Sequence, residues 1–175
     1  MTGTWSKASK AFHWVGAALI FYLLIHGFWM VGLPRELRLA HYETHAAAGY
    51  LFIALTLARL VWRWTHAVPP QPAGAARWEV VAAHAGHWGL YALMLAAALS
   101  GWALAGTFKR PLDSFFGWFT VPGIVPAGSA WRHEMLEEAH ELLAWTLVLL
   151  VVAHVAAAFY HWLWRKDDVM QRMLR

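Results

Sequence analysis

The stretch HELLAWTLVLLVVAH, from His140 to His154, decides the fold class. Between its two histidines, every residue except Glu141 and Thr146 is apolar. The apolar run that contains it extends over about 139–164, and a helix needs about 20 such residues to cross a ~30 Å hydrocarbon core. The sequence therefore predicts a transmembrane helix. An ionisable residue inside such a helix is costly, so each histidine is a candidate functional residue.

The composition of the whole chain supports membrane embedding. Of the 175 residues, 60% are hydrophobic and 14% are charged, whereas soluble domains carry about 25% charged residues. Thirteen tryptophans also fit a membrane protein, because indole rings favour the membrane–water interface. The net charge of +4 comes without the clustered basic run that a nucleic-acid-binding protein needs, so no nucleic-acid partner is expected.

Three further apolar runs precede the first one discussed. They cover about 12–33, 45–64 and 80–106, and the connections between them are short. Together the four runs predict an all-α membrane protein, a four-transmembrane-helix bundle that forms one domain over 1–175. The longest connection, 107–138, is rich in aromatic residues, proline and glycine, and we interpret it as an ordered lid or a short interfacial helix.

The distribution of basic residues predicts the orientation. Nine Lys and Arg residues lie on the side of both termini, and five lie on the opposite side. Because cytoplasmic loops carry an excess of Lys and Arg, both termini are expected in the cytoplasm.

The histidines form a pattern that helix geometry can interpret. The chain has eleven histidines and no cysteine, so histidine is the candidate metal ligand and any haem is bound non-covalently. Fourteen residues of α-helix rise about 21 Å and return a side chain to within roughly 40° of its starting direction. His140 and His154 therefore face the same interior at two depths, which suits two flat cofactors stacked across the membrane.

Partners for these two histidines must lie on other helices at matching depth. His45 opens the second run on the outer side, at the level of His140, so His45 and His140 form the first expected pair. On the inner side His13 pairs with His154, although counting from the ends of the runs places His154 deeper than His13. His87, in the third run, is the rival to His13 as the partner of His154.

Several features together resemble the bacterial cytochrome b561 family. They are the four apolar runs, the histidine of SKAFHW, the histidine that opens the second run, and the HE…H pair with 14-residue spacing. The C-terminal FYHWLWRKDDVMQRML is similar to that family's ending, so the resemblance covers essentially the whole chain. It implies a multi-pass dihaem b-type cytochrome of the bacterial inner membrane, with two haem b groups and bis-histidine ligation. The matching ligand positions are His13, His45, His140 and His154.

Bis-histidine ligation leaves no open position on the iron, so the implied function is transmembrane electron transfer between a periplasmic donor and membrane quinone. Some members of this family are described as superoxide oxidases that reduce ubiquinone. Lys109, Arg110 and Arg132 are accordingly expected to steer a small anionic donor such as superoxide. One alternative is an electron-transfer subunit docked to a periplasmic dehydrogenase or cytochrome. Another is a histidine-rich metal transporter without haem.

The remaining polar residues receive separate interpretations. Arg59, near the inner end of the second run, is predicted to pair with a haem propionate. His84, His87 and His161 are predicted to form the wall of a quinone pocket, because imidazole can relay the protons that quinone reduction needs.

Two further groups are interpreted without a role in the reaction. A cluster of glutamates is predicted to cap the N-terminus of the fourth helix, where carboxylates are favourable; they are Glu134, Glu137, Glu138 and Glu141. His26 and His66 are interpreted as non-functional.

Overall fold

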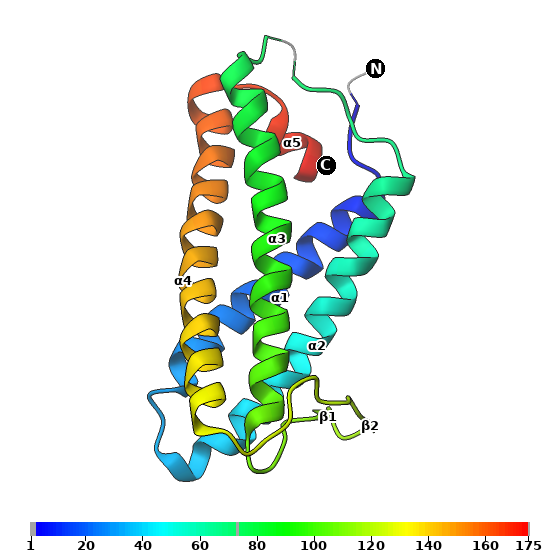
Figure 1. Cartoon of the computed structure of the whole chain (residues 1–175). Coiled ribbons are helices and arrows are strands. Elements are labelled where there is room, and N and C mark those ends of the chain that lie inside the picture. The colour runs from blue at the N-terminus through cyan, green and yellow to red at the C-terminus, as the bar shows by residue number, and fades with distance from the viewer. Residues whose placement is uncertain (1–2, 73, 175) are drawn as a thin grey trace.

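Four long helices make up most of the protein, which is described by a computed structural model over residues 3–72 and 74–174. In Figure 1 they are α1 (Lys7–Met30), α2 (Arg35–Thr65), α3 (Arg77–Thr107) and α4 (Ala130–Tyr160). Each is long and apolar enough to cross a membrane. The predicted four-helix membrane fold is confirmed, and it carries one short β-hairpin in addition.

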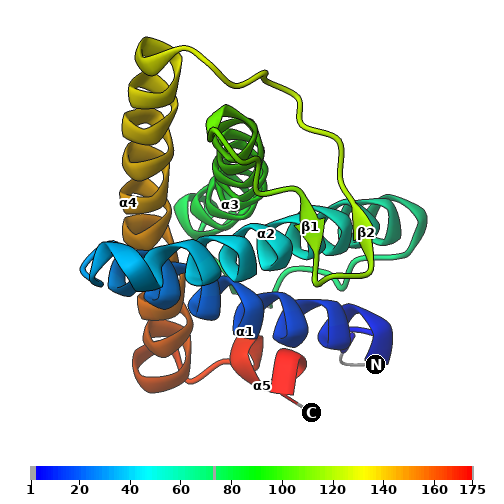
Figure 2. The same ribbon diagram turned by 90° about the horizontal axis from the view of Figure 1, so that it is seen from below.

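The helices form a bundle in which α3 and α4 run side by side, while α1 and α2 make up the other part (Figures 1 and 2). Both termini lie at the same end of the bundle, which we call the termini end. The β-hairpin lies at the opposite end, the hairpin end. That the termini end faces the cytoplasm, and that the whole chain forms one membrane domain, stay predictions.

The helices α2 and α4 begin well before the apolar runs that predicted them. The first turns of both helices are polar, RELRLA in α2 and AWRHEMLEE in α4, so hydropathy alone does not detect them. The N-cap of α4 is Ser129, whose side chain accepts a hydrogen bond from the backbone N–H of Arg132. No acidic residue lies in the first turn of α4, so the prediction that its glutamates cap the helix is wrong.

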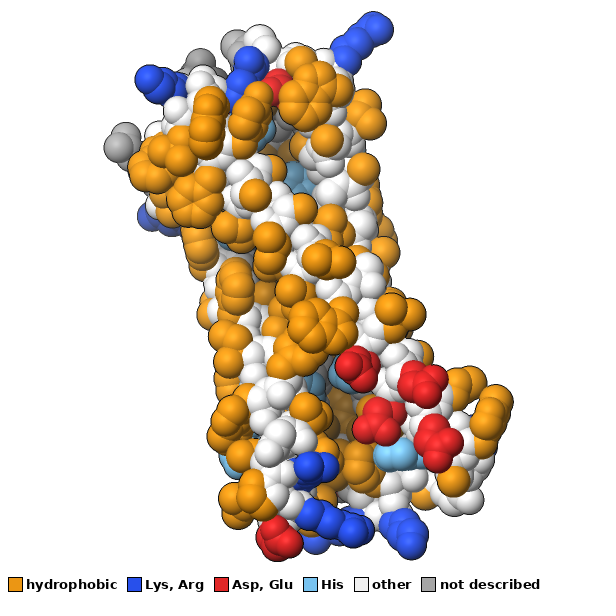
Figure 3. All heavy atoms as spheres, turned by 90° about the vertical axis from the view of Figure 1, so that its left-hand side faces the viewer, with side chains coloured by type: hydrophobic (Ala, Val, Ile, Leu, Met, Phe, Trp, Pro, Cys, Tyr) orange, Lys and Arg blue, Asp and Glu red, His pale blue; other side chains and the backbone are white. Residues whose placement is uncertain are grey.

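The buried core is small and lies midway along the bundle. Its contiguous cluster consists of Ile20, Phe52, Met94, Ala97 and Leu147, with at least one residue from each long helix. Large apolar side chains instead cover the outside of the bundle, between charged residues at its two ends (Figure 3). This surface is the one expected of a bundle whose outer face contacts lipid tails.

The connection from α3 to α4 contains a hairpin, where an ordered lid or a short interfacial helix was expected. Strands β1 (Ser114–Phe115) and β2 (Phe119–Thr120) pair antiparallel. The turn between them places Phe116 and Gly117 at positive φ, 49° and 79°, a conformation that glycine adopts at little cost. The hydroxyl of Tyr50 on α2 donates to the carbonyl of Leu112 at 2.7 Å and holds this connection against the bundle.

At the termini end, α4 continues as a π-helical turn, η1 (His161–Arg165), and the chain ends with the short helix α5 (Val169–Leu174). Arg172 of α5 donates to the carbonyl of Pro70 at 2.6 Å. Arg165 lies 3.2 Å from the buried carboxylate of Glu79 at the start of α3. These contacts hold the C-terminal segment against the α2–α3 connection and the start of α3, and Figure 2 shows α5 beside α1.

Candidate functional site

The hairpin end of the bundle contains a cavity of about 470 Å³ with residues of all four long helices in its lining. His45 on α2 and His140 on α4 both line it. Their ring centroids are 6.3 Å apart, and the ring planes are 83° from parallel. We call this the hairpin-side cavity. The first expected histidine pair is therefore brought together by the fold.

The two histidines of this pair lie at equal depth. His45 is ten residues after the start of α2 (45 − 35), and His140 is ten residues after the start of α4 (140 − 130). Both helices begin at the hairpin end, so each ring lies about 15 Å along its helix from that end. The matched depth follows from the helix starts.

The orientation of the His140 ring is fixed by hydrogen bonds from its Nδ1 to α3. Its Nδ1 lies 3.0 Å from the carbonyl oxygen of Ala97 and 3.0 Å from the hydroxyl of Ser100. Donation of the Nδ1 proton leaves Nε2 as the lone-pair nitrogen, which is the arrangement common among metal-binding histidines. Gly101 makes room for the ring, because a Cβ there would come within 2.9 Å of Cε1 of His140.

The termini end contains a second cavity, of about 570 Å³, lined by His13, His87 and His154. The ring centroids of His13 and His154 are 6.3 Å apart, and those of His87 and His154 are 5.6 Å apart. We call this the termini-side cavity. It brings together both the expected partner of His154 and the rival.

The mismatch in depth expected between His13 and His154 is absent. Helix α1 begins at Lys7, six residues before His13 (13 − 7), and α4 ends at Tyr160, six residues after His154 (160 − 154). The apolar runs placed the start of the first helix five residues too late (12 − 7) and the end of the fourth helix four residues too late (164 − 160), and these two differences together account for the apparent mismatch.

Arg59 lies beside His13 in the termini-side cavity. Its Nη2 is 3.3 Å from Nδ1 of His13, and its guanidinium lies over the ring of Tyr91 at 5.3 Å. Arginine has no acceptor, so Nδ1 of His13 accepts in this contact and the ring proton is on Nε2. His13 would then coordinate a metal through Nε2 only after Arg59 turned away, and a haem propionate is a group that would draw it.

The geometry of both pairs fits a haem iron between two imidazoles. With a metal–nitrogen bond of about 2.1 Å on each side, two imidazoles that bind one ion from opposite sides have centroids roughly 6.4 Å apart. Both expected pairs have 6.3 Å. Gly16 and Gly49 line the two cavities, and a Cβ at either would meet no protein atom within 4 Å. The cavities are also within the roughly 300–1,000 Å³ range of cofactor sites.

The residues expected to form a quinone pocket also lie at the termini end. His84, His87 and His161 all line the termini-side cavity. Nδ1 of His84 bonds to the carbonyl of Val80 in its own helix at 2.8 Å. Nδ1 of His161 lies 2.6 Å from the carboxylate of Asp167, which follows η1.

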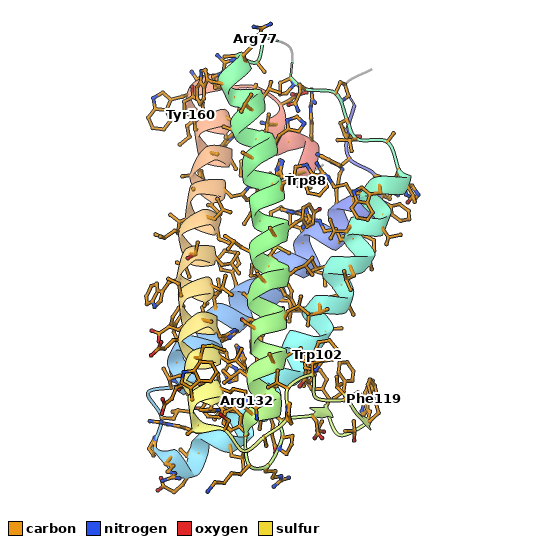
Figure 4. The ribbon with its side chains drawn as sticks, in the orientation of Figure 1. Arg77, Trp88, Trp102, Phe119, Arg132 and Tyr160 are labelled. Atoms are coloured by element: carbon orange, nitrogen blue, oxygen red, sulfur yellow. The ribbon has the colours of Figure 1, made fainter. Side chains whose placement is uncertain are left out.

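The residues expected to steer an anion do not line the hairpin-side cavity as the structure describes it. Lys109 and Arg110 are exposed just after α3, and Arg110 lies 3.6 Å from Glu43. Figure 4 shows Arg132 at the hairpin end, near the start of α4. The charged side chains in the described lining are Glu137 and Glu141. Figure 3 shows acidic side chains gathered there beside a histidine.

One histidine beside the site was not expected there from the sequence. His26, interpreted as non-functional, is buried on α1 and packs 5.9 Å from the ring of His45. Its Nε2 lies 3.1 Å from Nδ1 of His41 on α2. The available sequence signal was the position of His26 inside an apolar run. The residues that contact His26 depend on how α1 crosses α2, which the sequence does not show.

A bundle of membrane-spanning helices that holds facing histidine pairs beside two cavities has the arrangement of a membrane-integral b-type cytochrome. Comparison with known proteins agrees with this class. Residues 4–175 match the family model described as prokaryotic cytochrome b561, and the chain belongs to this family. Its members carry haem b and transfer electrons within the membrane.

Two relatives from Escherichia coli (strain K12) are similar over most of their length. The chain is 33% identical to cytochrome b561 homolog 2 over 168 residues, which cover 95% of this chain and 88% of the relative. It is 29% identical to cytochrome b561 homolog 1 over 179 residues, which cover 97% and 96%. The family resemblance inferred from the histidine motifs is confirmed.

Proposed function

We propose that this protein is a dihaem cytochrome of the bacterial inner membrane, with both termini in the cytoplasm, that transfers electrons from a periplasmic donor to membrane quinone. His45 and His140 would hold one haem b, and His13 and His154 would hold the other. The donor acts at the hairpin end and quinone at the termini end.

The observation that supports this proposal best is the equal spacing of the two pairs. Both have ring centroids 6.3 Å apart, and both consist of histidines at matched depth on two different helices. The two levels are separated by fourteen residues of α4, about 21 Å. A chance packing of polar side chains gives no reason for the same metal-sized spacing at both levels.

The chain's own residues would do distinct things at each level. Bound haem supplies one-electron chemistry, and two histidines per iron leave no position at which oxygen could bind. Ala97 and Ser100 hold His140 in one tautomer and one orientation. Arg59 would neutralise a propionate at the termini side, where it already lies within the cavity lining.

The proposed haem content is tested by a reduced-minus-oxidised spectrum and a pyridine haemochrome assay on purified protein. We expect two b-type haems per chain. A single haem would refute one of the two ligand pairs. A preparation from haem-sufficient cells with no Soret band would refute the cytochrome proposal and favour a histidine-rich metal transporter.

Quinone is proposed at the termini end, beside the termini-side haem, because the lining of the termini-side cavity is largely apolar and includes the exposed His84. Full reduction of a quinone takes two electrons and two protons, and His84 and His161 are the lining groups suited to pass protons from the cytoplasmic side. The hydrogen bond between His161 and Asp167 orients one of them. Each electron would come from a separate one-electron donor.

The nature of the donor has two candidates. Superoxide is the anionic candidate, for which Lys109, Arg110 and Arg132 at the hairpin end would provide attraction. The acidic lining contributed by Glu137 and Glu141 favours the second candidate, a basic periplasmic redox protein that docks at this end. In that case the chain would act as the membrane subunit of an electron-transfer pair.

The electrostatics of the donor site can be measured with the double variant Glu137→Gln/Glu141→Gln. At low salt we expect the double variant to have a several-fold lower rate of haem reduction by a basic c-type cytochrome and a higher rate of haem reduction by superoxide. Both differences should be lost at high salt. The matched control is Glu134→Gln/Glu138→Gln on the same helix, outside the described lining. Haems that stay oxidised under a superoxide flux would exclude superoxide as the donor.

A further inference from the structure

Behind His45 lies a second row of histidines that the electron-transfer proposal does not use. His26 on α1 packs against the ring of His45 at 5.9 Å between centroids, with 35° between the planes. On its other side, Nε2 of His26 is 3.1 Å from Nδ1 of His41. We call His45, His26 and His41 the histidine chain.

Two nitrogens at the centre of the histidine chain have no hydrogen-bond partner among the residues that the structure describes. They are Nδ1 of His26 and Nδ1 of His45, and both are buried. Cε1 of His45 points at α1 next to His26: a Cβ on Gly27 would come within 3.1 Å of Cε1, 3.8 Å of Nδ1 and 3.9 Å of Nε2. A hydrogen bond between two imidazoles needs centroids about 5.3 Å apart, so the two rings would pair their Nδ1 atoms by approaching roughly half an ångström with these nitrogens turned toward each other.

We propose that His26 is a positioning residue for the hairpin-side haem. Its Nδ1 accepts a hydrogen bond from the Nδ1–H group of His45, which orients this ligand and increases its basicity. The inference rests on the proposed role of His45 as an axial ligand. Outer hydrogen bonds of this kind set the tautomer and the donor strength of metal-binding histidines.

The tautomers along the histidine chain are mutually consistent. If His45 donates from Nδ1, its Nε2 holds the lone pair for the iron. His26 then accepts at Nδ1 and donates from Nε2 to Nδ1 of His41. The opposite direction would leave Nε2 of His45 protonated and unable to bind iron. The chain therefore has one direction that is compatible with ligation.

The ring of His26 is held rigidly enough for this role. Tyr22 stacks on it at 5.0 Å with 18° between the planes, and Trp29 stacks at 5.7 Å with 30°. These residues lie four before and three after His26, on the same face of α1. A histidine retained only for packing would need neither an aligned second histidine nor two stacked rings.

The histidine chain is expected to affect the reduction potential of the hairpin-side haem. A more basic axial ligand stabilises the oxidised iron, so loss of the acceptor should raise the potential of the hairpin-side haem. For His26→Leu we expect about a tenfold rise in the ratio of reduced to oxidised haem at a fixed poise, equal to ~59 mV for one electron. His41→Leu should shift it in the same direction by less, because it acts on His45 through His26.

The experiment is a potentiometric titration of both haems in the purified holoprotein, with low-temperature EPR of each oxidised sample. His26→Gln should restore at least half of the shift, because a glutamine amide can accept from His45 and donate to His41. His66→Leu is the control. His66 directly follows the last residue of α2 and stacks on Trp62 at 3.5 Å between ring centroids, far from the hairpin end. It should leave this potential unchanged.

The outcomes separate this inference from the proposed ligation. If His45→Ala keeps the hairpin-side haem, the ligand assignment itself fails. If His45→Ala loses that haem while His26→Leu and His41→Leu keep it at the wild-type potential, the positioning role of His26 is overturned. If His26→Leu loses the haem, His41→Leu carries the test, and a wild-type potential in that variant would overturn the proposal.

Discussion

Replacing His140 with alanine is expected to reduce the haem content from two per chain to one. His140 is one of the two histidines on the hairpin-side cavity whose rings face each other at 6.3 Å, and alanine offers no nitrogen in its place. The termini-side haem should remain, because its residues lie about 21 Å away along α4. A pyridine haemochrome assay with protein quantification measures the loss, and a potentiometric titration identifies which haem remains.

His133→Ala is the matched control for this substitution. His133 lies on the same helix, lines the same cavity and bonds to the hydroxyl of Thr107 at 2.7 Å, but it is not placed opposite His45. It should retain both haems. Two haems in the His140→Ala protein would contradict the proposed ligation of the hairpin-side haem.

The second large effect is expected at the termini side, where three histidines meet. His154→Ala should lose the termini-side haem whichever residue is its partner, because His154 lies opposite both His13 and His87. His13→Ala should lose the same haem, and His87→Ala should retain it. The reason is that the His13–His154 pair has the 6.3 Å spacing of the other pair, whereas His87 is closer, at 5.6 Å.

Haem counts on these three variants decide the assignment. Loss of haem in His87→Ala together with its retention in His13→Ala would transfer the ligand role to His87. His13 would then keep its contact with Arg59 as a polar neighbour of the site. Arg59→Lys adds an independent check, since a shorter reach to a propionate should change the potential of the termini-side haem and leave the other unchanged.

The pairing of His45 with His140 could be predicted because it depends on helix geometry alone. Fourteen residues of regular α-helix fix where His140 and His154 point, and the four apolar runs fix how many helices surround them. The helix starts could not be predicted from hydropathy, because the first turns of α2 and α4 are polar. For that reason the acidic residues of α4 were expected at its N-terminus.

Contacts that depend on how two helices cross were outside the reach of the sequence. The meeting of His26 with His45 depends on the crossing of α1 and α2, and no spacing along the chain encodes it. The same holds for Arg59, whose depth was predicted while its contact with His13 was not. The hairpin had one local signal, a glycine between aromatic residues in SFFGWFT, which favours a tight turn over the short helix that was considered.

The cluster at the centre of the bundle has an electrical consequence. Ile20 and Met94 line both cavities, so a single layer of apolar side chains separates the two proposed haem levels. Such a layer excludes water and ions, and a negative charge that crosses it has no accompanying proton. In the proposed orientation that charge moves toward the negative interior, against the membrane potential, at a cost of about 2.3 kcal/mol per 100 mV for a full crossing. An energised membrane would therefore oppose the forward reaction, and the state of the cell would itself regulate the flow of electrons into quinone.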